Sequence, residues 1–348
     1  MNKSAIVTFG EVMIRLSPQG ILKVAQANSF NTTYAGSEVN VAVSLGVMGE
    51  NIQYVTALSS NELGSKIFKE ISKYDVGTEH VIRNDARQGL LYVEKGAIIR
   101  SSKVIYDREN SAFSNISPGQ LNWDDIFSKA KWFHWSGITP ALSQNMYDVI
   151  KEAIISAKKL GVTISVDLNY RSSLWKYGKS SIEVMTDLVQ YCDVLIGNEE
   201  DAEKCLGIGV EGNDSDDELK KLSKSYYETI CSKVYRTLPK VKTICFTLRE
   251  SISASHNRWS AILSNAGCYY HSNIYELTHI VDRVGAGDSF SAALIYGINN
   301  FDSDFQHTLE FATAASALKH TIEGDFNLAS IKDVEDVILG NIPGRINR

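Results

Sequence analysis

Short runs of apolar, mostly β-branched residues alternate along this chain with longer segments of helical periodicity. The runs that we expect to form core strands are residues 5–10, 52–57, 132–136, 162–167, 194–196 and 241–246. Apolar residues recur at three- and four-residue spacing in the segments that we expect to be helices, which are residues 62–73, 144–160, 215–235, 285–298 and 305–320. This alternation predicts an α/β fold in which a mostly parallel sheet is covered by helices on both faces.

Residues 13–34 and 89–107 interrupt the alternation, because they have the pattern of hairpin strands with partly polar faces. They suit a small sheet, or lid, outside the main fold. Since the chain has only five prolines and no Gly/Ser-rich linker, we expect one domain, residues 1–348, with the lid inserted in it. The apolar positions of the lid are Ile14, Leu16, Ile21, Val24, Leu91 and Val93. An apolar face that the main domain cannot cover predicts a homodimer, or a higher homo-oligomer, formed through the lid.

The overall charge and the cysteines narrow the class of protein. The net charge is −6 and the basic residues are dispersed, which argues against a nucleic acid or an anionic membrane as partner and favours a small molecule. The five cysteines include no CxxC pair and are expected to be reduced packing residues. No apolar run reaches the roughly 18–20 residues that cross a bilayer, and no signal peptide precedes the first expected strand. These features predict a cytoplasmic protein.

The strongest chemical signal is the string Val281-Asp-Arg-Val-Gly-Ala-Gly-Asp-Ser-Phe290, which leads from strand-like residues into an amphipathic helix. A glycine-flanked turn at a helix start leaves backbone N–H groups unpaired at the positive end of the helix dipole, so it is typical of an anion site. We expect a γ-phosphoryl group on the amides of residues 285–288, and Asp288 within reach of a hydroxyl whose proton it would accept. Asp282 would orient groups around the triphosphate or its metal. The alternative is that Asp288 only caps the helix.

A second turn precedes another apolar helix, in Ala35-Gly-Ser-Glu-Val-Asn-Val-Ala42. Glycine lets the backbone approach a ligand closely, and Asn40 offers both a donor and an acceptor to hydroxyl groups. We expect Gly36, Ser37 and Asn40 to bind a sugar. The alternative is an ordinary strand-to-helix turn.

These motifs carry a resemblance to a known family. The string 281–290 resembles the C-terminal signature of the ribokinase-like (PfkB) carbohydrate kinases, and the Gly36 turn is similar to their sugar-binding element. Further matches, at residues 10–13, 136–142, 167–175 and 319–326, resemble the 2-keto-3-deoxygluconate kinases within that family. The resemblance implies a ribokinase-like, Rossmann-type three-layer sandwich with a small β-sheet lid, and the use of ATP and Mg²⁺. It also implies that Asp288 is the catalytic base, with Gly285, Ala286 and Gly287 as the anion hole.

The resemblance assigns roles to further residues. The implied substrate-binding residues are Tyr106, Arg108, Arg171 and Asp325, together with Asp288 and the Gly36 turn. The implied ATP-binding residues are Asn169, Asn198, Thr247, Arg249, Ser251, Gly285 and Gly287. Arg171 would lie between substrate and phosphates and take part in catalysis. Asp201 stands where the family has a Glu that arranges magnesium, so we expect it to act through water; Asn198 could instead cap a helix.

These implications favour one reaction, the ATP-dependent phosphorylation of 2-keto-3-deoxygluconate to 2-keto-3-deoxy-6-phosphogluconate. A sugar acid carries a carboxylate, which guanidinium groups bind through two parallel hydrogen bonds, so Arg108 and Arg171 suit it. Other readings stay open: a kinase of the galactonate epimer, of fructose or of ribose on the same fold, and a non-catalytic protein that senses sugars or nucleotides.

Overall fold

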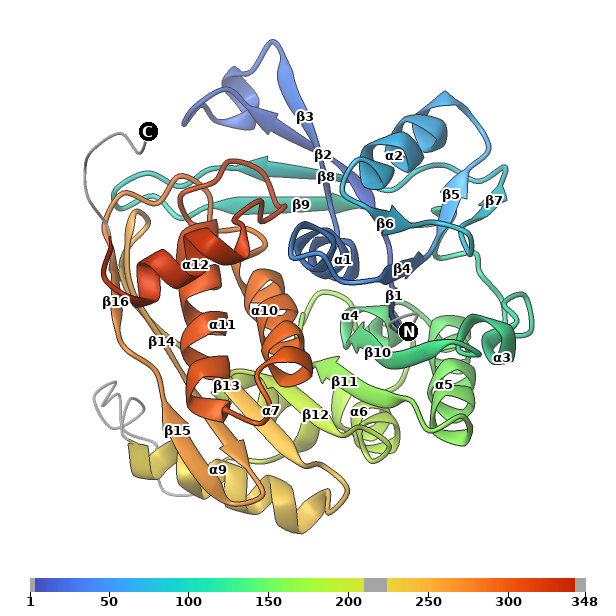
Figure 1. Ribbon diagram of the computed structural model, residues 1–348. Helices are drawn as coiled ribbons and strands as arrows, with labels where there is room; N and C mark the ends of the chain where they lie inside the picture. Colours follow the sequence, from blue (N-terminus) through green and yellow to red (C-terminus); the bar gives the residue numbers. More distant parts are fainter. Residues whose placement is uncertain (1–3, 210–223, 342–348) are drawn as a thin grey trace.

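A sheet of ten strands forms the centre of the molecule in the computed structural model, which describes residues 4–209 and 224–341 (Figure 1). The strand order is β15-β14-β13-β12-β11-β10-β1-β4-β6, and β16 pairs with β14. The strands from β6 to β13 run parallel, whereas β14, β15 and β16 are antiparallel to their neighbours. Their bounds are β1 Ala5–Phe9, β4 Ile52–Val55, β6 Val76–Gly77, β10 Ala130–Ser136, β11 Thr163–Asp167, β12 Val194–Gly197, β13 Thr243–Ser253, β14 His256–Asn265, β15 Cys268–His271 and β16 Tyr275–Leu277.

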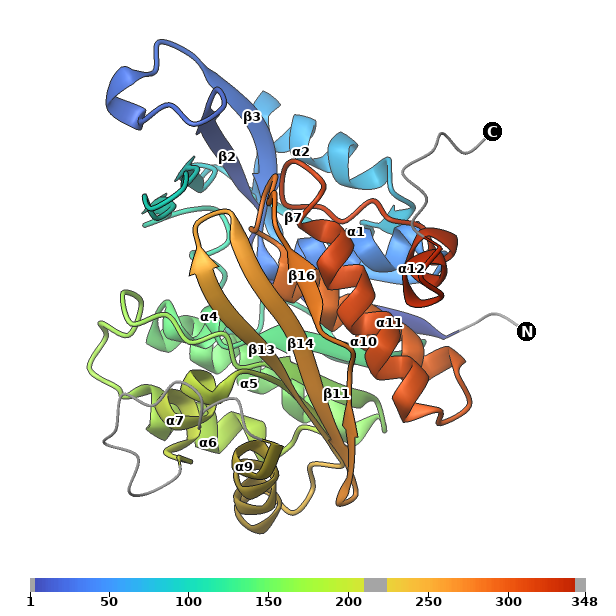
Figure 2. The same ribbon diagram turned by 90° about the vertical axis from the view of Figure 1, so that its left-hand side faces the viewer.

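Helices cover both faces of this sheet, which gives the expected three layers (Figure 2). One layer contains α1 Ser37–Val47, α2 Glu62–Ser72, α10 Ala286–Asn300, α11 Phe305–Lys319 and α12 Ile331–Ile338. The other contains α3 Trp123–Ile126, α5 Gln144–Lys159, α6 Ser181–Val189, α7 Glu199–Leu206 and α9 Lys224–Thr237, and the short α4 Ile138–Ala141 precedes α5. The predicted α/β fold class is therefore confirmed.

Alternate residues of the central strands pack into two separate cores, one under each helix layer. In β10, Trp132 belongs to one core, whereas Phe133 and Trp135 belong to the other. The three aromatic side chains are at most 3% exposed, because a strand buried on both faces presents successive side chains to opposite layers. No helix of the described residues is long and apolar enough to span a bilayer.

A separate four-stranded sheet, with the order β3-β2-β8-β9, stands over one edge of the main fold (Figure 1). Its strands are β2 Met13–Pro18, β3 Phe30–Ala35, β8 Leu90–Glu94 and β9 Lys103–Asp107, so both segments predicted to form the lid do so. Val24, however, lies in the short 3-10 helix η1 Val24–Gln26 between β2 and β3. Leu91 and Val93 are buried on the face of the lid opposite to that of Leu16, because successive residues of a strand point to opposite faces, so the predicted apolar positions do not share one face. A third, small sheet pairs β5 Ala57–Ser59 with β7 Ile82–Asn84.

The antiparallel edge of the main sheet is the largest feature that the sequence pattern did not predict. The strand expected at 241–246 runs on to Ser253 and returns as β14. Polar residues such as Arg258 and Ser260 interrupt the apolar run in β14, since an antiparallel strand need not be apolar on both faces. Residues 215–223 of the helix expected at 215–235 lie outside the described residues. The cysteines are free, but Cys268 is exposed, so packing accounts only for the other four.

Candidate active site

A cavity of about 560 Å³ lies between the lid and the carboxyl ends of the parallel strands, where open α/β sheets bind ligands. Its walls come from β11 and β12, from β13, from the starts of α1 and α10, and from the lid. The residues predicted to form the site that line it are Gly36, Ser37, Asn40, Tyr106, Arg108, Asn169, Arg171, Asn198, Asp201, Thr247, Arg249, Gly285, Ala286, Gly287, Asp288 and Asp325. The structure thus gathers almost the whole predicted set around one cavity.

Two residues with predicted roles do not line this cavity. Ser251 lies on the same face of β13 as Thr247 and Arg249 but further along the strand, where it is exposed and opposite Asn257. Asp282 is buried behind the cavity wall and forms an ion pair of 2.7 Å with Arg15 of β2. Neither placement was predicted. The sequence does not show how far the hairpin that carries Ser251 extends, nor that the buried Asp282 has Arg15 as its partner.

Asp288 lies in the first turn of α10, and its carboxylate faces α1. The Ser37 hydroxyl donates to Oδ1 at 2.8 Å, and the Asn40 amide donates to Oδ2 at 2.7 Å. Asp288 does not cap its own helix, because the residue at the cap position is Gly285 and no side chain makes a capping bond there. Burial raises the pKa of Asp288 above its ordinary value, while the hydrogen bonds from Asn40 and Ser37 lower it. The two hydrogen bonds fix the carboxylate in the orientation that a proton acceptor needs.

The turn before Asp288 has the backbone geometry of an anion site. Gly285 has a φ of 84°, and a Cβ there would lie 2.1 Å from the Asp325 carbonyl oxygen, so the position requires glycine. The amides of Gly285, Gly287 and Asp288 donate to no acceptor in the described parts of the chain. Three free N–H groups at the N-terminus of a long helix suit a phosphate group.

Arg108 is largely buried and already has an anionic partner, which the sequence did not reveal. Its Nε donates to Glu11 at 2.8 Å, and its Nη2 lies 2.5 Å from the same carboxylate oxygen. The Ser111 hydroxyl donates to the other oxygen of Glu11. Nη1 of Arg108 has no partner among the described residues, so this group can bind a substrate carboxylate while Glu11 holds the guanidinium in place. The Tyr106 ring lies 5.9 Å from the guanidinium carbon.

Arg171 follows β11 and is exposed. Its Nη1 donates to the Tyr170 carbonyl at 2.8 Å, and it forms no ion pair within 4 Å with the described residues. Burial raises the pKa values of Asp167, Asp201 and Asp288, and the positive charge of Arg171 opposes that rise. Arg171 is therefore a cation free to bind an anionic ligand.

Asp167 and Asn169 extend the site beyond the end of β11. Burial, followed by the nearby charges of Asp201 and Asp288, raises the pKa of Asp167 well above its ordinary value. This acid was missed, although it begins a motif that the sequence singled out. Asn169 has a φ of 41°, and its buried side-chain oxygen has no hydrogen-bond donor in the described structure. The Asn169 oxygen and the Asp167 carboxyl group both face the cavity, so they can bind a ligand with hydroxyl groups or ordered water.

Asn198 and Asp201 form a capping box at the start of α7. The Asn198 side chain accepts from the Asp201 amide at 2.8 Å, and Asp201 Oδ2 accepts from the Asn198 amide at 3.0 Å. Asp201 Oδ1 accepts from the Tyr170 amide at 2.8 Å, and burial raises the pKa of Asp201 to about 6. The alternative in which Asn198 caps a helix is the one that the structure shows.

The acceptors at this end of the cavity can hold magnesium only loosely. No group of three or more His, Cys, Asp or Glu side chains in residues 4–209 and 224–341 could enclose a metal ion. Asp167, Glu199 and Glu200 nevertheless line the same wall as Asp201, and carboxylates that reach magnesium through its waters are a usual arrangement. The donor set therefore fits a hydrated Mg²⁺ carried by a polyphosphate.

Arg249 of β13 faces a second guanidinium that the sequence did not predict. Burial and the charge of Arg249 lower the pKa of Arg283, which lies in the string 281–290 and donates to the Ala254 carbonyl. Trp259 and His320 complete this wall of the cavity, and their rings pack edge to face at 5.5 Å. Two neighbouring cations beside an apolar wall suit the phosphates and the base of a nucleotide.

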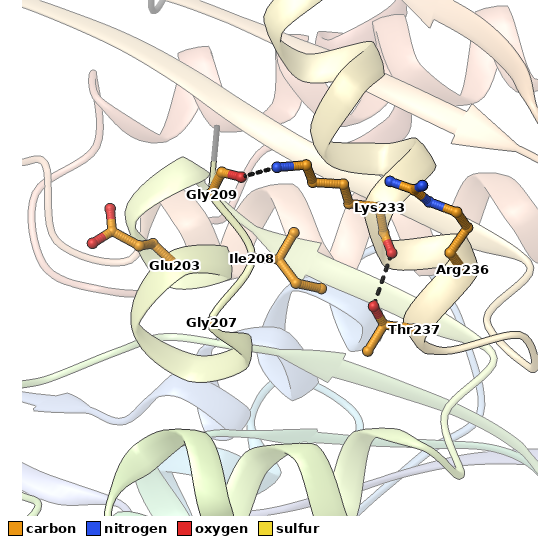
Figure 3. A pocket seen from close by; sticks show the side chains of 7 residues that line it. All are labelled: Glu203, Gly207, Ile208, Gly209, Lys233, Arg236 and Thr237. Atoms are coloured by element: carbon orange, nitrogen blue, oxygen red, sulfur yellow. Dashed lines mark hydrogen bonds between the residues drawn. The ribbon is translucent and has the colours of Figure 1, made fainter. Parts of the chain in front are cut away.

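A second cavity, of about 620 Å³, lies between α7 and α9 (Figure 3). The side chains around it include Glu203, Lys233 and Arg236, and Lys233 donates to the Gly209 carbonyl at 2.6 Å. Although it is larger, it contains none of the residues predicted to carry chemistry. The smaller cavity beside Asp288 is therefore the candidate active site.

Comparisons with known proteins agree with this geometry. The family model described as "pfkB family carbohydrate kinase" matches residues 3–328. The chain is 31% identical to the 2-dehydro-3-deoxygalactonokinase of Haloferax volcanii, over 97% of this chain and 98% of the relative. It superposes on the crystal structure of the Thermotoga maritima 2-dehydro-3-deoxygluconokinase with a TM-score of 0.90 and 45% identity, covering 97% of this chain and 100% of that one. A putative ribokinase II of E. coli, in complex with ATP and Mg²⁺, shares the fold with a TM-score of 0.77 and 17% identity, over 97% and 99% of the two chains.

Proposed function

Because the chain belongs to the pfkB family of carbohydrate kinases, we propose that it transfers the γ-phosphoryl group of ATP to the terminal hydroxyl of 2-keto-3-deoxygluconate. The product is 2-keto-3-deoxy-6-phosphogluconate. The observation that carries the proposal is the position of Asp288 between three free backbone amides and the sugar-side residues Ser37 and Asn40. An acid beside an anion site is costly unless it has a chemical task.

Asp288 acts as the base of the transfer. Ser37 and Asn40 hold its carboxylate in place, and it accepts the proton of the attacking hydroxyl as the oxygen–phosphorus bond forms. The amides of Gly285, Gly287 and Asp288 stabilise the negative charge on the transferred group, while Arg249 and Arg283 bind the remaining phosphates. Asp167 and Asp201 would hold a hydrated Mg²⁺ through its waters, and the ion would supply further positive charge to the phosphates. Since the transition state is loose, alignment and charge account for most of the rate.

The two arginines of the cavity favour a sugar acid over a neutral sugar. Arg171 is an exposed cation, and Arg108 retains a free Nη1 beside Tyr106. A carboxylate between them makes charge-assisted hydrogen bonds, whereas a neutral ketose or pentose leaves them without an anion. The unaltered Asp288 argues against a protein that only senses sugars or nucleotides.

The galactonate epimer is the second candidate substrate, because one of the relatives is a 2-dehydro-3-deoxygalactonokinase. We favour the gluconate-derived acid because the T. maritima neighbour is 45% identical. The deciding experiment is a coupled ADP-release assay with both epimers, fructose and ribose as acceptors. The proposal requires the highest kcat/KM for 2-keto-3-deoxygluconate; a higher value for the galactonate epimer or for a neutral sugar would replace it.

The lid supports a homodimer as the working form. Its face turned away from the cavity carries apolar side chains at neighbouring register positions, namely Leu16, Phe30, Tyr92 and Ile105. Ile105 is 44% exposed, and the ring centroids of Phe30 and Tyr92 lie 5.9 Å apart. A second lid packed on this face would remove it from water, and each lid would close over its own substrate.

A further inference from the structure

Lys319, the last residue of α11, is completely buried, although it does not line the cavity. Its ammonium group donates to the Ile322 carbonyl at 3.0 Å, and it lies 3.5 Å from the Asp282 carbonyl. A buried lysine loses the hydration of its charge, so it persists only where other groups compensate for that loss. Nothing in the phosphoryl transfer described above uses this lysine.

The compensation comes from a buried charge cluster, which consists of Arg15, Asp282, Lys319 and Asp325. Arg15, from lid strand β2, pairs with Asp282 at 2.7 Å and with Asp325 at 2.5 Å. Each of the four residues is at most 4% exposed. Lys95, which follows β8, also lies 3.9 Å from Asp282, so three cations surround the two carboxylates. The nearby carboxylates also favour the charged form of Lys319, against the effect of burial, which lowers its pKa.

This cluster lies directly behind the anion turn. Asp282 Oδ1 accepts from the Val284 amide at 3.2 Å, and Asp282 Oδ2 accepts from the Gly324 amide at 3.3 Å. Gly285 packs against the Asp325 carbonyl so closely that no Cβ fits between them. The conformation of the turn therefore depends on how the segments 282–285 and 322–325 are held together, and Lys319 bonds to a carbonyl in each.

We infer that Lys319 is a positioning residue. Its ammonium group holds these two segments together and thereby fixes the orientation of the free N–H groups of the anion turn. An ammonium group and a monovalent metal ion satisfy the same need, because both are cations that several carbonyl oxygens can surround. Lys319 thus supplies, from within the chain, a positive charge next to the Asp282 and Ile322 carbonyls. Its charge also acts on Asp288 and favours the ionised base. The inference rests on the proposed function, since the turn is taken to hold the γ-phosphate.

Two substitutions separate a positioning role from a merely structural one. Lys319→Met keeps an unbranched side chain but removes the ammonium group, and kcat should fall roughly ten- to a hundredfold, the usual effect of losing hydrogen bonds from a charged donor. The KM for the sugar should change less than kcat, because Ser37, Asn40 and Arg108 line the cavity from other elements and make no contact with Lys319. Lys319→Ala leaves a space lined by carbonyls, so ammonium or potassium ions in the buffer should restore part of its kcat in a saturable manner. Neither ion should increase the kcat of the native protein.

The control is Lys131→Met, which removes a partly buried lysine of β10 that pairs with Glu50 and should leave kcat unchanged. Calorimetric titration with ATP and with ADP gives a second readout that needs no turnover: Lys319→Met should lose affinity for ATP but keep its affinity for ADP, since only ATP has a γ-phosphate. A Lys319→Met protein with native kcat and native ATP affinity overturns the inference, and so does a native protein whose kcat requires potassium. Failure of the proposed function is a different result, a native protein that phosphorylates no sugar.

Discussion

Asn40 donates a hydrogen bond of 2.7 Å to the carboxylate of Asp288, across 248 positions of sequence. This contact joins the two strongest motifs of the chain, the turn before α1 and the turn before α10. Ser37 donates to the other oxygen of the same carboxylate at 2.8 Å. Hydrogen bonds to the ionised form of an acid lower its pKa, so these two donors keep Asp288 ready to accept a proton although burial opposes its ionisation.

Asn40→Ala should therefore move the pH dependence of the reaction. Removal of the amide raises the pKa of Asp288, and because the base must be ionised, the acid limb of the kcat/KM profile should shift to higher pH. Asn299→Ala, which removes an amide bonded only within α10, is the control and should leave the profile in place. An unchanged acid limb in Asn40→Ala would show that this hydrogen bond does not tune the base.

Arg108→Ala should weaken binding of the sugar acid far more than binding of ATP. A hydrogen bond to a carboxylate from a charged donor contributes about 1.5–3 kcal/mol, so the sugar KM should rise roughly ten- to a hundredfold. The variant also leaves Glu11 buried without its cation, and its unfolding temperature should fall as well. Arg87→Ala removes an exposed arginine paired with Asp107 and serves as the control. Equal losses for sugar and ATP would remove Arg108 from the substrate site.

Glu38 makes the stability of the protein depend on pH. Burial raises its pKa from 4.5 to about 7, against the opposing effect of the Ser136 hydroxyl and amide, which donate to its carboxylate. A group with a higher pKa in the folded state binds more protons there, so the free energy of unfolding falls as pH rises from about 4.5 to 7, by up to about 3 kcal/mol. Other buried acids act in the same direction. Urea titrations across this range should therefore show a smaller decline for Glu38→Gln; parallel curves for both proteins would contradict the assignment.

The lid face can be tested by placing a charge on it. Ile105→Asp changes a side chain that is 44% exposed in the single chain, so the fold should survive while burial of an unpaired carboxylate in the interface breaks the dimer. Sedimentation velocity at micromolar concentration should show a dimer for the native protein and a monomer for the variant, with a raised sugar KM. Ile155→Asp, on an exposed position of α5, is the control. A native protein that is a fully active monomer would exclude the lid dimer.

The site residues that the sequence predicted correctly lie in motifs whose conformation depends on neighbouring residues. Glycine turns at helix starts, such as those at Gly36 and Gly285, depend on neighbouring residues, and the parallel strands bring them to one edge of the sheet. The residues that it missed depend on distant partners. Glu11 meets Arg108 across 97 positions, and Arg15 meets Asp282 across 267, and no pattern within either segment announces the other. The hairpin of β13 and β14 was missed for a similar reason. The hydrogen bonds between the two strands determine how far each strand extends, and so where Ser251 lies.

The most direct test of the account is the turnover of Asp288→Asn. Asparagine keeps the size of the side chain and one acceptor for Asn40, but it cannot take the proton of the attacking hydroxyl. The kcat should fall by roughly two to four orders of magnitude, while ATP binding measured by calorimetry stays near the native value. Asp304→Asn, at the start of α11, retains a capping acceptor for the His307 amide and should keep native turnover. An Asp288→Asn protein that phosphorylates 2-keto-3-deoxygluconate at close to the native rate would contradict the assignment of Asp288 as the catalytic base.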